Sequence, residues 1–250
     1  PMEWMGIYMG NRIWSNDFKK GRDPVHDRAL FIGEEDDVAD KPFGPLLPNR
    51  REWARSMCDF VGYVLPFDPA HLQDRSRIRA RLGYGDGPLI VCSVGGTAIG
   101  RELLTLCGRS FAHLEKRLDG VRMVLVCGPR LAAEALEAPE GVEVRGYVPD
   151  LFEHFAACDL AIVQGGGTTT LELTALKRPF LYFPIEGHFE QAMVAERLER
   201  HKAGVRMSLS KTSPRDLAEQ VLTTLQSDCA IAPIPVDGGR RAAELIAEMM

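Results

Sequence analysis

The stretch LAIVQGGGTTTLE, residues 160–172, decides the fold class. Its first four residues are apolar without alternation, as in a strand that is buried on both faces. Three glycines and three threonines follow directly, and helical spacing continues through residues 168–177. A buried strand that passes through a glycine turn into a helix is the repeating unit of a parallel α/β sheet. The stretch therefore predicts a parallel sheet and raises the question of what its bare backbone contacts.

The same alternation extends over most of the chain. Strand-like runs occur at residues 88–96, 121–128, 142–148, 160–167, 179–184 and 204–209. Helical spacing occurs at residues 98–118, 130–138, 150–159, 168–177, 189–201, 213–226 and 240–250. This pattern predicts a Rossmann-like α/β domain, a parallel sheet with helices on both faces, over residues 71–250. Residues 1–70 are irregular and proline-rich, and we expect an N-terminal extension there whose acidic run, residues 34–37, is a solvated loop.

The composition of the chain argues against several classes of protein function. The chain of 250 residues has a net charge of −5, and so lacks the basic footprint of a nucleic-acid-binding protein. No apolar run approaches the roughly 18–20 residues that span a bilayer, and we expect a cytoplasmic protein. Cys92 and Cys127 lie in apolar strands and none of the six cysteines forms a CxxC pair, which favours buried, reduced thiols over disulfides or metal ligands.

Three loops follow expected strands and should lie together, because ligands of parallel sheets bind at the carboxyl ends of the strands. In residues 93–103, two glycines and a threonine, residues 95–97, stand between the strand and the expected helix, and residues 164–172 carry three glycines and three threonines. Glycine lets a ligand approach the backbone, and a helix N-terminus favours an anion such as phosphate. Each loop alone also fits a tight strand-to-helix turn, and neither matches GxGxxG or the P-loop pattern.

The remaining polar residues of these loops suit a sugar nucleotide. Glu172 falls in the first turns of its helix, where a carboxylate is favourable with the helix dipole and could also accept two hydrogen bonds from a ribose diol. Residues 183–198 open with Glu186, His188, Glu190 and Gln191, a density of hydrogen-bonding groups that can read sugar hydroxyls. A surface loop opening an amphipathic helix is the alternative for that segment.

In this order and spacing, the three loops resemble the donor-binding half of GT-B glycosyltransferases. The likeness covers about residues 85–225 and is strongest over residues 147–207. It is greatest to the C-terminal domain of glycosyltransferase family 28, which includes the peptidoglycan N-acetylglucosaminyl transferase, and extends to the UDP-glucuronosyl transferases. The segment QGGGTTTLE is similar to the family's HGGxGTTLE loop, and Glu190–Gln191 is similar to its acidic residue–glutamine pair.

The resemblance implies a role for each matching position. The donor diphosphate would lie against Gly95, Gly96, Thr97, Gln164, Gly165, Gly166, Gly167, Thr168, Thr169 and Thr170. Glu172 would bind the ribose, Tyr147 and Val148 would flank uracil, and His188, Glu190 and Gln191 would face the donor sugar. Gln164 replaces a histidine of many relatives, and Val194 replaces a frequent asparagine, so the sugar is left open.

The implied activity is transfer of a hexose or N-acetylhexosamine from a UDP-sugar, with inversion and without a metal or other cofactor. The sequence has no Asp-x-Asp motif after a strand, and it offers no catalytic base. Residues 1–70 look like the tail of an acceptor domain and a linker, so we expect a truncated enzyme or a subunit that needs an acceptor domain or partner chain. A membrane-peripheral acceptor fits this family. The alternatives are a non-catalytic nucleotide-sugar-binding subunit and a UDP-sugar 2-epimerase.

Overall fold

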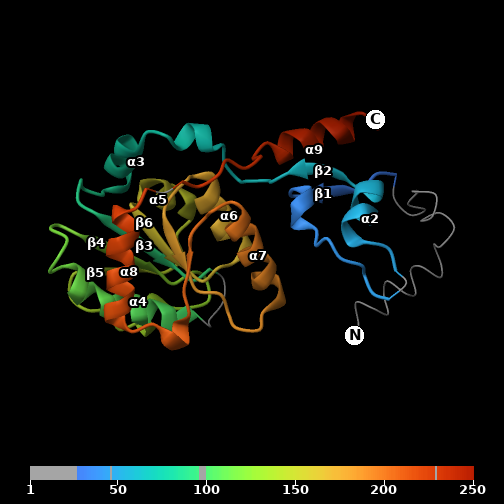
Figure 1. Cartoon of the computed structure of the whole chain (residues 1–250). Coiled ribbons are helices and arrows are strands. Elements are labelled where there is room, and N and C mark those ends of the chain that lie inside the picture. The colour runs from blue at the N-terminus through green and yellow to red at the C-terminus, as the bar shows by residue number, and fades with distance from the viewer. Residues whose placement is uncertain (1–26, 46, 96–99, 229) are drawn as a thin grey trace. The chain divides into compact units, whose positions relative to one another are not determined.

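The structure is a computed structural model that describes residues 27–45, 47–95, 100–228 and 230–250 (Figure 1). Its contacts group the chain into two units. The larger unit is Phe67–Pro233, and the smaller one combines Pro1–Pro66 with Ile234–Met250. The sequence was expected to divide at residue 70, with all of residues 71–250 in one domain. The contacts instead group Ile234–Met250 with the smaller unit.

A six-stranded parallel sheet forms the centre of the larger unit. Its strands are β3 (Leu89–Ser93), β4 (Arg122–Val126), β5 (Val142–Arg145), β6 (Leu160–Val163), β7 (Phe180–Tyr182) and β8 (Val205–Arg206). They lie in the order β5-β4-β3-β6-β7-β8, and every neighbouring pair is parallel. All six expected strands are present, and the chain reverses its direction of growth across the sheet between β3 and β6.

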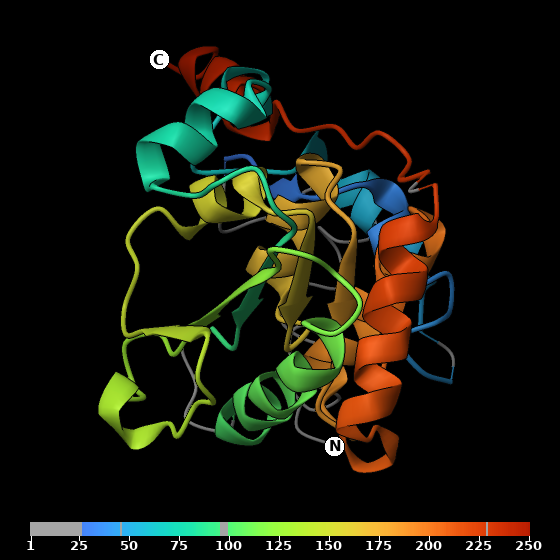
Figure 2. The same ribbon diagram turned by 90° about the vertical axis from the view of Figure 1, so that its left-hand side faces the viewer.

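Helices cover both faces of this sheet, which confirms the predicted fold class. The α-helices of the unit are α3 (Arg75–Leu82), α4 (Arg101–Leu114), α5 (Leu151–Ala157), α6 (Gly167–Ala175), α7 (Phe189–Arg200) and α8 (Pro214–Gln226). Short 3-10 turns are η2 (Pro69–Leu72), η4 (Ala133–Ala135) and η5 (Leu209–Lys211). Helices α3, α5, α6 and α7 pack on one face, and α4 and α8 lie side by side on the other (Figures 1 and 2).

The strands divide their side chains between two apolar cores. Leu89 and Val91 of β3 point into the core under α5 and α6, whereas Ile90 and Cys92 point into the core under α4 and α8. All five residues of β3 are buried, as expected of a central parallel strand that is covered twice. Each fully buried aliphatic side chain contributes about 1.5–3 kcal/mol. Cys92 is a free, buried thiol, as the sequence predicted.

One expected helix is nearly absent. Residues 130–138 were predicted to be helical, but only η4 forms there. Leu136 is the one buried residue of that span, and prolines at positions 129 and 139 flank it. A helix of this length depends on packing of an apolar face, and this segment buries only Leu136, with Leu131 and Ala138 partly buried against the core.

The smaller unit contains a parallel pair of strands, β1 (Leu30–Ile32) and β2 (Asp59–Gly62). Its helices are η1 (Glu35–Asp37), α2 (Arg50–Met57) and α9 (Gly238–Ala247). The acidic run is not the solvated loop that we expected. It forms η1, in which the Tyr63 hydroxyl lies 2.7 Å from Asp37 Oδ2 and 3.0 Å from Glu34 Oε2. Arg51 also pairs with Asp36 at 3.0 Å, so cations and a phenol stabilise these carboxylates.

Candidate functional site

The site lies where the strand order reverses. Strands β3 and β6 are neighbours in the sheet, but the helices that follow them, α4 and α6, lie on opposite faces. The connections after the two strands therefore diverge, and a crevice opens between them at the carboxyl ends of the strands. Such a crevice is the usual ligand position in an open α/β sheet.

The loop after β6 presents backbone to this crevice. Gly165 has a φ of +86°, a left-handed conformation that side chains rarely adopt. Gly166 is the N-cap of α6 and supplies no side-chain cap, so the helix begins without the usual hydroxyl or carboxylate on its first N–H groups. A Cβ built on Gly166 meets nothing within 4 Å. The uncapped helix end faces open space, an arrangement suited to an anion.

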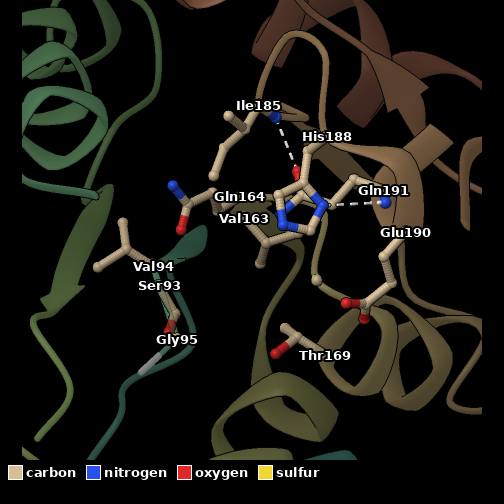
Figure 3. A pocket seen from close by; sticks show the side chains of 11 residues that line it. Ser93, Val94, Gly95, Val163, Gln164, Thr169, Ile185, His188, Glu190 and Gln191 are labelled. Carbon is tan, nitrogen blue, oxygen red and sulfur yellow. Dashed lines mark hydrogen bonds between the residues drawn. The ribbon is translucent and has the colours of Figure 1, made fainter. Parts of the chain in front are cut away.

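A pocket of about 260 Å³ occupies the crevice (Figure 3). Three segments contribute its walls, namely the loops after β3, β6 and β7. It is lined by Ser93, Val94, Gly95, Val163, Gln164, Gly166, Thr169, Ile185, His188, Glu190 and Gln191. The structure thus brings together seven residues that the sequence predicted: Gly95, Gln164, Gly166, Thr169, His188, Glu190 and Gln191.

The start of α7 forms one wall of the pocket. His188 is the N-cap of α7, and its Nδ1 accepts a hydrogen bond from the backbone N–H of Gln191 at 3.4 Å. Gln191 in turn accepts one from the N–H of Ile185 through its Oε1 at 2.7 Å (Figure 3). This bond fixes the Gln191 amide so that its NH2 group remains a donor for a ligand. Glu190 is exposed beside it.

The three threonines of the loop do not act alike. Thr169 lines the pocket, Thr168 is exposed outside the lining, and Thr170 is fully buried. The Thr170 hydroxyl lies 2.8 Å from the carbonyl oxygen of Gly166, to which it donates. The structure therefore does not support the prediction that all three hydroxyls converge on one ligand. Helical rotation of about 100° per residue carries consecutive side chains in different directions.

Glu172 is buried in α6, with 9% of its surface exposed, and it does not line the pocket. Burial raises the pKa of its carboxyl group to about 7. Within the described part of the chain, no hydrogen-bond or ion-pair partner of this carboxylate is found. A buried carboxyl group with a pKa near neutrality is the kind of residue that marks functional sites.

The other predicted residues lie apart from the pocket lining or outside the description. Tyr147 follows β5 with 69% of its surface exposed, and Val148 packs against the core. Gly165 is buried near Pro184, and the Gly167 carbonyl oxygen accepts a hydrogen bond from Arg197. Gly96 and Thr97 lie outside the described residues.

Sequence reasoning missed four lining residues: Ser93, Val94, Val163 and Ile185. Ser93 and Val163 are the last residues of β3 and β6. Their position at a strand end was the available signal, because the last residue of a central strand borders the crevice whatever its side chain.

Two features are absent from the described residues. None of their helices is long and apolar enough to cross a membrane. Among the same residues, no three or more His, Cys, Asp or Glu side chains are clustered so that they could hold a metal ion.

Known proteins share this sequence pattern. A glycosyltransferase of Methanopyrus kandleri is 28% identical over 192 residues, 75% of this chain and 53% of the relative. The UDP-N-acetylglucosamine–N-acetylmuramyl-(pentapeptide) pyrophosphoryl-undecaprenol N-acetylglucosamine transferase of Carboxydothermus hydrogenoformans is 24% identical over 67% of this chain and 46% of its own. The chain therefore spans about half the length of these curated relatives.

Solved structures share the fold. The calicheamicin glycosyltransferase CalG4 matches with a TM-score of 0.58 at 19% identity, over 96% of this chain and 60% of that one. MurG of Acinetobacter baumannii matches with a TM-score of 0.56 at 17% identity, over 79% and 62%. The model of the glycosyltransferase family 28 C-terminal domain matches residues 90–244, which include every loop of the pocket. On this match, the chain belongs to the family of glycosyltransferase family 28 C-terminal domains.

Proposed function

We propose that this chain is the donor-binding half of a glycosyltransferase that transfers a hexose or N-acetylhexosamine from a UDP-sugar. The observation that carries the proposal is the uncapped N-terminus of α6, which opens on a pocket at the strand-order reversal. Membership of family 28 supports glycosyl transfer as the activity. The N-acetylglucosamine transferase among the relatives makes UDP-N-acetylglucosamine the first donor to test.

In the proposed binding mode, each loop of the pocket binds a different part of the donor. The diphosphate lies at Gly166 and Thr169, where backbone N–H groups and a hydroxyl meet it. His188, Glu190 and the Gln191 amide contact the sugar from the start of α7. Gln164 can donate a neutral hydrogen bond to a phosphate, but it cannot add positive charge there.

The proposed chemistry depends on where charge develops. When the bond to the anomeric carbon breaks, the nucleoside diphosphate leaves as an anion. The first N–H groups of α6 are already oriented toward that position, so they stabilise the charge with little reorganisation. Inversion and a reaction without metal are part of the proposal and rest on the family likeness. The acceptor and the catalytic base are assigned to an acceptor domain or partner chain.

Glu172 is proposed to hold the ribose hydroxyls. Its carboxyl group is buried and has no hydrogen-bond or ion-pair partner among the described residues, and a ribose diol would supply two donors to it. Glu172 is not among the residues that line the pocket, so in this role the nucleoside extends beyond the pocket as it is lined.

The proposal is tested by titrating the chain with UDP in a calorimeter. Glu172→Ala should weaken UDP binding by about 1–3 kcal/mol, the scale of a lost charge-assisted hydrogen bond. Gly166→Val should abolish it, since the new side chain fills the open space while a φ of −67° tolerates it. The matched control is Glu196→Ala on the exposed face of α7, which should bind like the wild type.

The outcomes separate the alternatives. If the wild type and Gly166→Val bind UDP with the same affinity, the proposed diphosphate position at Gly166 and Thr169 is wrong. An epimerised sugar formed from UDP-N-acetylglucosamine without any acceptor would replace the transferase with an epimerase. Tight binding without turnover, even after addition of an acceptor domain, would favour a non-catalytic subunit.

A further inference from the structure

Helices α6 and α7 each begin at the donor pocket, and one side chain joins them. Arg197 of α7 donates a hydrogen bond from Nη2 to the carbonyl oxygen of Gly167 at 3.1 Å. Gly167 is the first residue of α6. The bond therefore ends on the helical turn whose N–H groups face the proposed diphosphate position.

Arg197 lies on the side of α7 that contacts Gly167, and it donates a hydrogen bond from there. Glu190, Val194 and Arg197 are spaced four and three residues apart, so they lie on one side of the helix. A Cβ built on Gly167 would lie 3.7 Å from Glu190 Oε1 and 3.7 Å from Val194 Cγ2. Val194 has no hydrogen-bonding group and the Glu190 carboxylate cannot donate to a carbonyl oxygen. Of these three residues, only Arg197 can donate a hydrogen bond to the carbonyl oxygen of Gly167.

The glycine turn needs such support. Residues 165–167 are three consecutive glycines, and glycine has the largest conformational freedom of any residue. No side chain caps α6, and Thr170 donates within the turn, at 2.8 Å to the Gly166 oxygen. Arg197 adds a contact from a different helix, which ties the turn to the rest of the fold.

We propose that Arg197 is a positioning residue for the donor diphosphate. It holds the Gly167 carbonyl, and through it the direction of the first N–H groups of α6. The same bond joins α7, the helix that His188 caps, to the first residue of α6. Arg197 is not among the residues that line the pocket, so it acts through Gly167 and not by touching the ligand. This inference rests on the proposed function.

The test compares Arg197→Gln with the wild type in calorimetric titrations of UDP and of uridine. UDP should bind about tenfold more weakly to the variant, the effect of one hydrogen bond, because the phosphate-facing N–H groups lose their fixed direction. Uridine, which lacks the diphosphate, should bind within about twofold of the wild type. A general loss of packing would weaken both ligands alike, so the ratio of the two affinities identifies a positioning role.

Two further variants complete the design. Arg197→Lys keeps the charge and should recover part of the UDP affinity, and it serves as the folded variant if Arg197→Gln does not fold. Arg215→Gln removes an exposed charge from α8 and should leave both affinities unchanged. An unchanged ratio of UDP to uridine affinity in Arg197→Gln and Arg197→Lys would overturn the inference.

A measurement without ligand keeps this inference distinct from the proposed function. Amide hydrogen exchange over residues 165–171 should be faster in Arg197→Gln than in the wild type and Arg215→Gln. Failure of the wild type to bind UDP would overturn the proposed function. Unchanged exchange in Arg197→Gln would overturn the role of Arg197 whatever the wild type binds.

Discussion

Two carboxylates in this chain, the partly buried Asp159 and the buried Glu172, show how surroundings decide the charge state of a residue. Asp159 precedes β6 and receives hydrogen bonds from Arg75, from Arg79 and from the N–H of Leu89. Burial disfavours its charge, but these partners outweigh burial and hold its pKa below the usual range. Glu172 is buried, the described part of the chain offers its carboxyl group no such partner, and burial raises its pKa. The Asp159 carboxylate therefore stays charged and stabilises the fold through its ion pairs. A ligand that binds the Glu172 carboxyl group could change the protonation of that group.

The raised pKa of Glu172 predicts a pH dependence of stability. The folded state holds this proton more tightly than the unfolded state, whose reference pKa is 4.5. The resulting stabilisation is complete below about pH 4.5 and is lost as the pH rises through about 7. Relative to Glu172→Gln, the wild type should therefore lose on the order of 2 kcal/mol of unfolding free energy across that window. Urea denaturation at a series of pH values measures this difference.

Glu196→Gln, a change at an exposed position of α7, is the control and should follow the wild type at every pH. His154 is also buried and its pKa is lowered, first by burial, so its contribution is lost in the opposite direction, as the pH falls below 6.5. The comparison with Glu172→Gln cancels that contribution, since His154 is present in both proteins. A constant difference between them from acid to neutral pH would contradict the raised pKa.

At the scale of elements, the two ends of the central strands differ in function: one borders the pocket and the other carries ion pairs. The carboxyl ends of β3 and β6 border the pocket, whereas Asp159 lies at the amino end of β6. There it joins α3 to the sheet, because Arg79 binds both its carboxylate and the carbonyl oxygen of Ala157. One end of the sheet is held by ionic contacts, and the other remains open to a ligand.

This separation predicts that Asp159→Asn affects stability without affecting the site. Removal of the charge leaves Arg79 nearly buried without its counter-ion, which should cost about 2–4 kcal/mol. UDP affinity at neutral pH should stay within about twofold of the wild type, because the pocket is at the opposite end of the strand. Chemical denaturation and UDP titration of the same samples measure the two effects.

The matched control is Glu153→Gln, which breaks the more exposed pair between Arg81 and Glu153 at 2.8 Å. That change should cost less than about 1 kcal/mol. Weakened UDP binding by folded Asp159→Asn would show that the two ends of the sheet are coupled.

The sequence predicted the elements better than it predicted the directions of side chains. An unbroken apolar run such as residues 160–163 is typical of a strand covered on both faces, and the alternation of strand-like and helical segments predicted the six strands and their parallel pairing. Gly166 could be predicted as a site residue, since a bare helix start after a buried strand borders the crevice. The different fates of Thr169 and Thr170 could not be predicted, because they depend on where α6 begins and how it is rotated. Nor could the contact from Arg197, which requires the packing of α7 on α6.

The acidic run of the smaller unit, residues 34–37, also has contacts that could not be predicted from the sequence. Four consecutive carboxylates predicted exposure, since nothing near them in sequence offers a partner. Tyr63 and the arginines of α2 come from 15 to 29 residues away and supply those partners. Pairing at that sequence distance is a property of the tertiary fold, and no local pattern carries it.

At the scale of the molecule, both apolar cores lie within Phe67–Pro233. The core under α3, α5, α6 and α7 runs from Phe67 to Ile231, and the core under α4 and α8 lies between them in sequence. All described pocket residues belong to the same segment. We therefore expect a chain of residues 67–233 to fold by itself and to bind UDP with wild-type affinity.

The segment can be compared with the full chain by circular dichroism, thermal unfolding and UDP titration. A single cooperative transition with unchanged UDP affinity is expected, since unfolding free energy in this unit comes from cores that the truncation leaves whole. Residues 27–66 and 234–250 would then contribute to recognition of another domain or chain and not to donor binding. A segment that unfolds without cooperativity, or that loses UDP binding while it remains folded, would instead make the smaller unit part of the donor-binding structure.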